Sequence, residues 1–258
     1  VGLRTRVTTA QETKSQAIGD LRSLLLGVLR VTVVIESVTA IALVLRWWLG
    51  YGESFGRAAY LGVFHAVSAF NNAGFALYTL NVMDFSGDAV VLLTLSSCVI
   101  LGGLGFPVLA ELRRHIRIPH RWSMNTRLVL FATPLLLLSG TVFILVLEWS
   151  NPATLGSQSP AVKVLNAFFQ STISRTAGFN SIDISQMHPV SWLGMDILMF
   201  IGGGPAGTAG GIKITTFGVL LFIIIAELRG GSSDARLASD PLATVTASGN
   251  HHGLVTSY

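Results

Sequence analysis

The residues best able to do chemistry lie in a glycine-rich stretch, residues 201–213, with the sequence IGGGPAGTAGGIK. Within it, Gly202, Gly204 and Gly207 satisfy the spacing G-x-G-x-x-G of dinucleotide-binding proteins. Glu227 follows twenty residues after Gly207, where an acid would bind the ribose of a dinucleotide. The spacing therefore predicts a dinucleotide-binding enzyme, provided that the rest of the chain forms a soluble α/β domain.

The same stretch also suggests a P-loop or a broken membrane helix. A phosphate-binding P-loop is excluded, because Lys213 is followed by Ile214 where that motif requires Ser or Thr. A break in a membrane helix fits the composition, because glycines and a proline each disfavour helix interiors. Such a break is tolerated at membrane depth only where its backbone is buried in protein or lines a watery cavity.

Composition favours the membrane. The chain of 258 residues is 51% hydrophobic and 12% charged, against about 25% charged residues in soluble domains. Residues 89–110 and 128–147 contain no charge, and each is long enough to cross a hydrocarbon layer of about 30 Å as a helix. A soluble doubly wound sheet does not contain such segments, so the dinucleotide-binding enzyme becomes a distant alternative.

Two weaker spans complete the set. Residues 24–49 are interrupted by Arg30, Glu36 and Arg46 and end in Trp47 and Trp48, which are expected at interface depth. Residues 192–228 form a second apolar segment that the glycine-rich stretch breaks. Glu36 is open to two interpretations, a functional intramembrane carboxylate or a hydrogen bond to a neighbouring helix.

Charge predicts the orientation. Basic residues gather between the second and third spans, where Glu111 is the only nearby acid: Arg113, Arg114, His115, Arg117, His120, Arg121 and Arg127. The positive-inside rule places this loop in the cytoplasm and is preferred to nucleic-acid binding. Residues 50–88 and 148–190 are acidic or balanced and are expected outside. Cys98 is the only cysteine, which excludes an internal disulfide, and the pair His251 and His252 is expected to be solvated.

Internal repetition organises the chain. LVLRW at 43–47 recurs as LVLEW at 145–149, AGF at 73–75 recurs at 177–179, and AELR at 110–113 recurs at 226–229. The offsets are 102, 104 and 116, so the glycine-rich stretch is an insertion into the second copy, and Glu227 is the counterpart of Glu111. Residues 57–70 are too short to span and predict a re-entrant helix within the first copy.

A re-entrant helix points its negative C-terminal end into the membrane, and the extended backbone after it can offer carbonyl oxygens to a cation. Gly74 and Gly178 mark these positions in the two copies. A simple turn at each Ala-Gly-Phe is the alternative interpretation.

The sequences NNAGF at 71–75, RTAGFN at 175–180 and GGGPAGTAGGIK at 202–213 resemble the Trk/Ktr/HKT family of potassium transporters. The resemblance implies an all-α membrane fold in which four span, pore-helix, span repeats surround one pore, of which this chain holds the second and third. The chain is therefore expected to be a fragment of a longer subunit. The resemblance assigns the selectivity filter to Asn71, Asn72, Ala73, Gly74, Phe75, Arg175, Thr176, Ala177, Gly178 and Phe179. It assigns an intramembrane gate loop to Gly202, Gly203, Gly204, Pro205, Ala206, Gly207, Thr208, Ala209, Gly210, Gly211 and Lys213.

The expected organisation is a cytoplasmic linker (1–22), a pore repeat (23–114), a cytoplasmic basic loop (115–124), a second pore repeat with the gate loop (125–229) and a polar tail (230–258). The expected function is gated potassium uptake across the plasma membrane, with K⁺ at backbone carbonyls near Gly74 and Gly178 and without cofactor or enzymatic chemistry. The resemblance also implies a homodimer of the complete subunit and a cytoplasmic nucleotide-binding regulatory ring. A secondary transporter with tandem repeats and a broken helix is the alternative.

Overall fold

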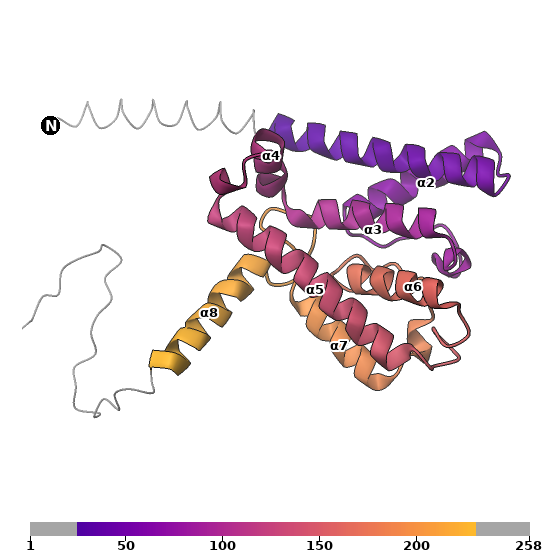
Figure 1. Cartoon of the computed structure of the whole chain (residues 1–258). Coiled ribbons are helices and arrows are strands. Elements are labelled where there is room, and N and C mark those ends of the chain that lie inside the picture. Colours follow the sequence, from indigo (N-terminus) through magenta and orange to yellow (C-terminus); the bar gives the residue numbers. More distant parts are fainter. Residues whose placement is uncertain (1–24, 231–258) are drawn as a thin grey trace, which may run out of the picture. The chain divides into compact units, whose positions relative to one another are not determined.

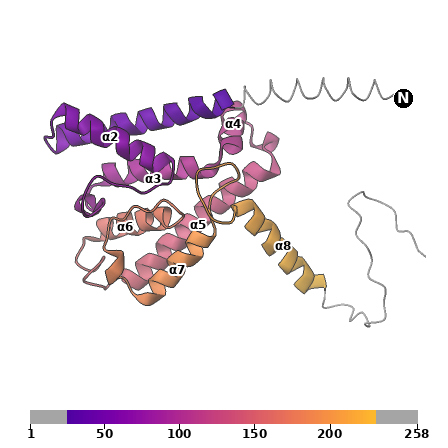
Figure 2. The same cartoon turned by 180° about the vertical axis from the view of Figure 1, so that it is seen from behind.

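The computed structural model describes residues 25–230. Within this range the regular structure is helical, apart from one isolated bridge between Ile201 and Ile212, which confirms the predicted all-α fold (Figures 1 and 2). The helices are a first span at Leu25–Gly50, α2 (Phe55–Phe70), α3 (Ala89–Leu104), α4 (Phe106–His115), α5 (Met124–Glu148), α6 (Pro160–Ile173), α7 (Pro189–Phe200) and α8 (Ile214–Gly230), with single turns η1 (Arg46–Gly50), η2 (Met83–Phe85), η3 (Pro119–Arg121) and η4 (Ile184–Gln186).

The chain divides into two compact units, Val1–Val219 and Leu220–Tyr258, and the first holds the two predicted pore repeats up to the start of α8. The predicted linker at 1–22, and the predicted tail beyond residue 230 with His251 and His252, lie outside the described residues.

Two helices are long and apolar enough to cross a membrane by themselves, Leu25–Gly50 with 26 residues and α5 with 25. At 1.5 Å per residue they are about 38 Å long. The span predicted at 89–110 is broken, because α3 ends at Leu104 and α4 leaves at an angle of 97°; the two helices qualify as a third span only when they are counted together. Gly105, whose φ is +92°, forms the corner. Pro107 at the start of α4 suits a helix N-terminus.

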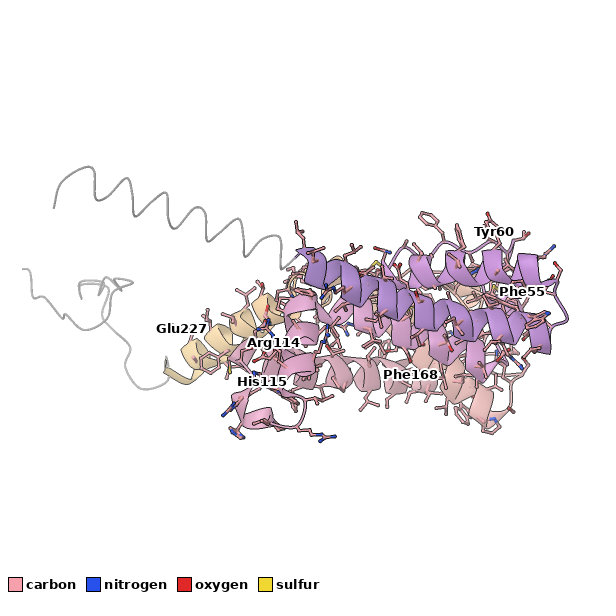
Figure 3. All side chains as sticks on the ribbon, turned by 90° about the horizontal axis from the view of Figure 1, so that it is seen from above. Phe55, Tyr60, Arg114, His115, Phe168 and Glu227 are labelled. Carbon is pink, nitrogen blue, oxygen red and sulfur yellow. The ribbon has the colours of Figure 1, made fainter. Side chains whose placement is uncertain are left out.

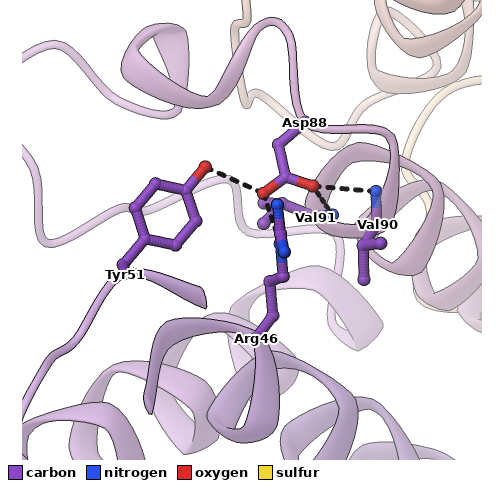
Figure 4. Close-up of polar contacts among 5 residues, drawn as sticks. All are labelled: Arg46, Tyr51, Asp88, Val90 and Val91. Atoms are coloured by element: carbon purple, nitrogen blue, oxygen red, sulfur yellow. Dashed lines mark hydrogen bonds and ion pairs between the residues drawn. The ribbon is translucent and has the colours of Figure 1, made fainter. Parts of the chain in front are cut away.

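The two shorter helices, α2 with 16 residues and α6 with 14, are too short to span. Each lies in a hairpin between two longer helices, and the hairpin brings the end of the first longer helix back to the start of the second. In the first hairpin, Asp88 at the start of α3 holds the end of the first span. Its Oδ2 accepts from Arg46 Nε at 2.7 Å and from Tyr51 Oη at 2.8 Å, while Oδ1 accepts from the backbone N–H of Val90 and Val91 (Figure 4). Asp88 therefore caps α3 and closes the hairpin.

Glu148 at the end of α5 closes the second hairpin. It is fully buried and accepts from the backbone N–H of His188 at 2.9 Å and from the hydroxyls of Ser191 and Thr154. In the repeated motif Glu148 corresponds to Arg46. The carboxylate that closes the hairpin therefore lies at the start of the second helix in the first repeat (Asp88) and at the end of the first helix in the second repeat (Glu148). In both repeats it joins the end of the first helix to the start of the second.

Trp47, at the end of the first span, belongs to the protein core. Its side chain is fully buried, and its ring lies 5.1 Å from that of His65 and 5.8 Å from that of Phe85. Trp48 and Trp149 are exposed. Phe179 of the second repeat stacks on His65 of the first at 6.4 Å, so the two repeats share one core.

Large apolar side chains cover the outside of the helices. Phe131 and Val146 on α5 are 72% and 74% exposed, and Phe55 and Tyr60 on α2 also project outward (Figure 3). Soluble proteins do not expose apolar surface along whole helices, so this surface suits lipid or further protein.

Candidate functional site: two filter segments and a gate loop

The two predicted filter segments, residues 71–75 and 175–179, follow α2 and α6 and lie against each other. A Cβ atom placed on Gly74 would be 2.5 Å from the carbonyl carbon of Gly178 and closer still to the carbonyl oxygen of Ala177. The structure therefore brings together the two glycines that mark the repeat in the sequence.

Both segments have the same backbone conformation. Asn72 and Gly74 have φ of +52° and +71°, and Thr176 and Gly178, 104 residues later, both have φ of +81°. The residues between and beside them have negative φ. Residues that alternate in the sign of φ turn successive peptide groups toward one side of the chain, whereas a β-strand turns them to opposite sides in alternation. The repeat found in the sequence is thus also a repeat in backbone geometry.

Most carbonyl oxygens of the two segments find no hydrogen-bond donor within residues 25–230. They are those of Asn71, Asn72, Ala73, Arg175, Thr176, Ala177, Gly178 and Phe179. In the first segment the last two oxygens are engaged: Asn81 Nδ2 donates to Gly74 at 3.3 Å, and Ser68 Oγ donates to Phe75 at 2.8 Å. The unengaged oxygens of that segment therefore end at Ala73.

Asn81 joins the two segments, although nothing in the sequence pattern predicted this role. While its Nδ2 donates to Gly74, its Oδ1 accepts from the backbone N–H of Asn180 at 3.3 Å, and Asn180 in turn accepts from the N–H of Val82. Asn81 itself has φ of +57°, which Asn tolerates better than most residues. The only feature of the sequence that could have indicated this role is the position of Asn81, seven residues after Gly74.

Glu36 contacts the first filter segment. Its Oε1 accepts from Asn71 Nδ2 at 3.1 Å, so of the two interpretations the structure favours the hydrogen bond to a neighbouring element. This bond ties the first span to the start of the filter segment.

The gate loop, residues 202–213, connects α7 with α8 and is closed at its base. The backbone N–H of Gly202 donates to the carbonyl oxygen of Ile212 at 3.0 Å, and the N–H of Ile212 donates to the carbonyl oxygen of Phe200 at 2.9 Å. Lys213 Nζ donates across the loop to Ala209 at 2.6 Å. The stretch follows a helix instead of a strand, so it lacks the context of a dinucleotide-binding motif.

One side of the gate loop rests on the corner between α3 and α4. Gly204 N–H donates to Gly103 at 2.7 Å, Thr208 N–H donates to Gly102 at 3.0 Å, and Phe106 N–H donates to Ala206 at 3.2 Å. The first two bonds use carbonyls that the end of α3 leaves without helical partners. The corner of the first repeat is therefore the seat of the loop inserted into the second.

The other side of the gate loop is held by the residues that begin the two filter segments. Thr208 Oγ1 donates to Phe70 at 2.7 Å and accepts from Asn72 Nδ2 at 2.6 Å. From the second segment, Arg175 Nη2 donates to Gly202 at 2.7 Å, and Thr176 Oγ1 accepts from Gly210 N–H at 2.9 Å. Asn72, Arg175 and Thr176 thus hold the loop with their side chains, a role that the sequence did not predict.

The basic residues lie on α4, on η3, between these two helices and at the start of α5. All five arginines are exposed, and none forms an ion pair within the described part of the chain; Arg114 and His115 are labelled in Figure 3. Glu111 is engaged with Ser123, whose N–H and hydroxyl both donate to it at 2.7 Å. No group of residues able to hold a metal ion through His, Cys, Asp or Glu occurs among residues 25–230.

The family model of TrkH, described as a cation transport protein, matches residues 4–243. The chain belongs to this family. It is 44% identical over 201 residues to the Ktr system potassium uptake protein B of Vibrio alginolyticus, covering 78% of this chain and 44% of that protein. It is 40% identical over 230 residues to the protein of the same name from Bacillus subtilis (strain 168), covering 89% and 51%.

A solved structure supports the fold of this TrkH-family chain. The potassium transporter TrkH from Vibrio parahaemolyticus matches with a TM-score of 0.58 at 20% identity, covering 83% of this chain and 42% of that one. The chain thus spans about half the length of the curated relatives it matches. Its own helices, two of which are long and apolar enough to cross a membrane, fit a multi-pass membrane protein.

Proposed function

We propose that this chain supplies two filter segments and the gate loop of a potassium uptake pathway. The observation that carries the proposal is the pair of adjacent segments with matched φ alternation, which leaves three carbonyl oxygens in the first and five in the second without a donor among the described residues. Carbonyl oxygens in such a row replace the hydration shell of K⁺. The names of the two Ktr relatives, both potassium uptake proteins, support the choice of ion.

The pathway is passive. The C-terminal ends of α2 and α6 carry partial negative charge and stabilise a cation beside Gly74 and Gly178. With the basic segment in the cytoplasm and the filter segments reached from outside, the membrane potential drives K⁺ inward at about 2.3 kcal/mol per 100 mV. The gate loop, bonded to both filter segments, closes the path beneath them.

The resemblance extends the proposal to partners. The complete subunit acts as a homodimer, and a cytoplasmic nucleotide-binding regulatory ring docks on the basic segment. The exposure of its five arginines, unpaired within the described residues, supports a docking role.

The test uses a chimera in which this sequence replaces the matching half of the Bacillus subtilis relative, expressed in cells that lack their own potassium uptake. We expect the chimera to restore growth at low potassium, and Gly178→Ser to reduce K⁺ selectivity over Na⁺. The parent protein is the control for expression. A chimera that reaches the membrane at the parent's level without restoring uptake contradicts the proposal.

Shortening the gate loop tests its part separately. Deleting residues 205–207 disrupts the seat of the loop on the corner of α3 and α4, so we expect potassium flux through the chimera to rise. An unchanged flux at unchanged expression would show that the loop does not limit transport.

A further inference from the structure

A small cavity of about 20 Å³ lies where the filter segments meet the gate loop. It is bordered by α3, α5, the end of α6 and the gate loop, and its polar or small lining residues include Asn72, Thr133, Thr172, Arg175, Gly203 and Ala209. A cavity that accepts a water molecule needs at least about 10–15 Å³. This one therefore has room for one water-sized ligand.

Two polar atoms at this cavity are buried and find no hydrogen-bond partner in the described chain. They are Asn72 Oδ1, an acceptor, and Arg175 Nε, a donor. Both residues are more than nine-tenths buried, with 8% and 7% of their surfaces exposed. Buried polar groups are nearly always satisfied by protein or ordered water, so each of these atoms needs a partner.

We propose that the cavity binds a single water molecule that accepts from Arg175 Nε and donates to Asn72 Oδ1. Water is the ligand that satisfies both atoms, since it offers an acceptor and a donor together. A cation is disfavoured by the permanent charge of Arg175, which has no carboxylate partner within residues 25–230. An anion would face Asn72 Oδ1 without a proton to donate to it.

The water completes a latch on the gate loop. Asn72 and Arg175 both line the cavity, and each has one buried atom without a partner among the described residues. With its other polar atoms Asn72 donates from Nδ2 to Thr208 of the loop, and Arg175 donates from Nη2 to Gly202. One water therefore links a side chain from each repeat, and each of these side chains also holds the loop. The water site depends only on these contacts, whereas its role in holding a gate rests on the proposed function.

The direct test is a high-resolution crystal structure of the purified chain, with crystals also soaked in rubidium or bromide salts. We expect a density peak at about 2.7–3.2 Å from both Arg175 Nε and Asn72 Oδ1, without anomalous signal from either ion, and its loss in Asn72→Leu. A missing peak overturns the proposal, and so does anomalous signal at the site or a direct bond between the two side chains.

A second test measures coupling through thermal unfolding. Asn72→Leu and Arg175→Met each remove one partner of the water and are expected to lower Tm, whereas the double variant should lose less than the sum of the two shifts. The control pairs Arg175→Met with Thr208→Val, because Thr208 bonds Asn72 but does not line the cavity. Equal non-additivity in the control pair would assign the coupling to the loop and overturn the water bridge.

Measurements of potassium flux through the chimera distinguish a failure of this inference from a failure of the proposed function. In the chimera, Asn72→Leu is expected to raise potassium flux by releasing the loop, and an unchanged flux would refute the latch. A chimera without any uptake would refute the proposed function, while the density peak and the Tm coupling would still decide whether water is bound.

Discussion

Replacing Gly74 by Ala should perturb the molecule far more than the same change at Gly178, although the two glycines are equivalent in the repeat. Both have positive φ, which costs a residue with a Cβ about 1–2 kcal/mol. Only Gly74 faces a backbone at close range: its Cβ would lie 2.6 Å from Gly178 Cα, whereas a Cβ on Gly178 would meet nothing closer than 3.6 Å.

The extra cost at Gly74 is that of overpacking, about 1–3 kcal/mol. Gly178→Ala should therefore lower the free energy of unfolding by about 1–2 kcal/mol, and Gly74→Ala by about 2–5 kcal/mol in total. Because the obstacle is the Ala177 to Gly178 peptide, Gly74→Ala should displace the carbonyl of Ala177 in the other repeat. A substitution in one filter segment would thereby alter ion coordination in the second.

Gly52→Ala is the matched control, since Gly52 has φ of +71°, like Gly74, with no atom within 4 Å of an added Cβ. Denaturant unfolding of the purified variants gives the three stabilities, and uptake by the corresponding chimeras gives K⁺ selectivity over Na⁺. We expect Gly52→Ala and Gly178→Ala to be similarly stable, and Gly74→Ala to be the least stable and least selective. Equal losses at Gly74 and Gly178 would refute the steric argument.

Two further predictions concern polar anchors. Asn81→Ala should reduce K⁺ selectivity over Na⁺ in uptake and cost about 2–4 kcal/mol in unfolding, because the three hydrogen bonds of its side chain are lost and Ala tolerates the positive φ less well; unchanged selectivity would exclude Asn81 from positioning the filter. Burial raises the pKa of Asp88, but the hydrogen bonds from Arg46, Tyr51 and Val91 outweigh it and leave the pKa below its ordinary value. The stability that Asp88 contributes is thus complete above about pH 4 and lost as pH falls through the lowered pKa. Asp88→Asn should cost about 1–2 kcal/mol at pH 7 and remove this acid-dependent loss, whereas an identical loss in the variant would mean that another group causes it.

The repeat and the helical class were predictable because they depend on local signals. Uncharged segments of 20 residues or more report spans, and three motifs at similar offsets report duplication. The corner at Gly105 was harder to predict. Gly102, Gly103, Gly105 and Pro107 allowed a kink, but they did not specify an angle of 97° or the hydrogen bonds to the gate loop about 100 residues later.

The polar contacts of the site could not be predicted, because they join residues far apart in the chain. Asn72 and Thr208 are separated by 136 positions, and Asn81 and Asn180 by 99. The burial of Trp47 was missed for a related reason. A Trp beside a charged residue at a helix end is typical of the interface, and the rings that enclose it come from α2 and the following loop.

The loop inserted into the second repeat and the corner between α3 and α4 in the first repeat are complementary. The loop inserted into the second repeat carries buried backbone N–H groups, which need hydrogen-bond partners within the protein. The first repeat supplies carbonyls by ending α3 early, and at Gly105 the space that a Cβ would fill is taken by the carbonyl of Pro205. A side chain at Gly105 would therefore displace the loop from its seat without touching a filter segment. The glycines at the end of α3 and those of the gate loop thus pack against each other, and each set is needed for the other to approach closely.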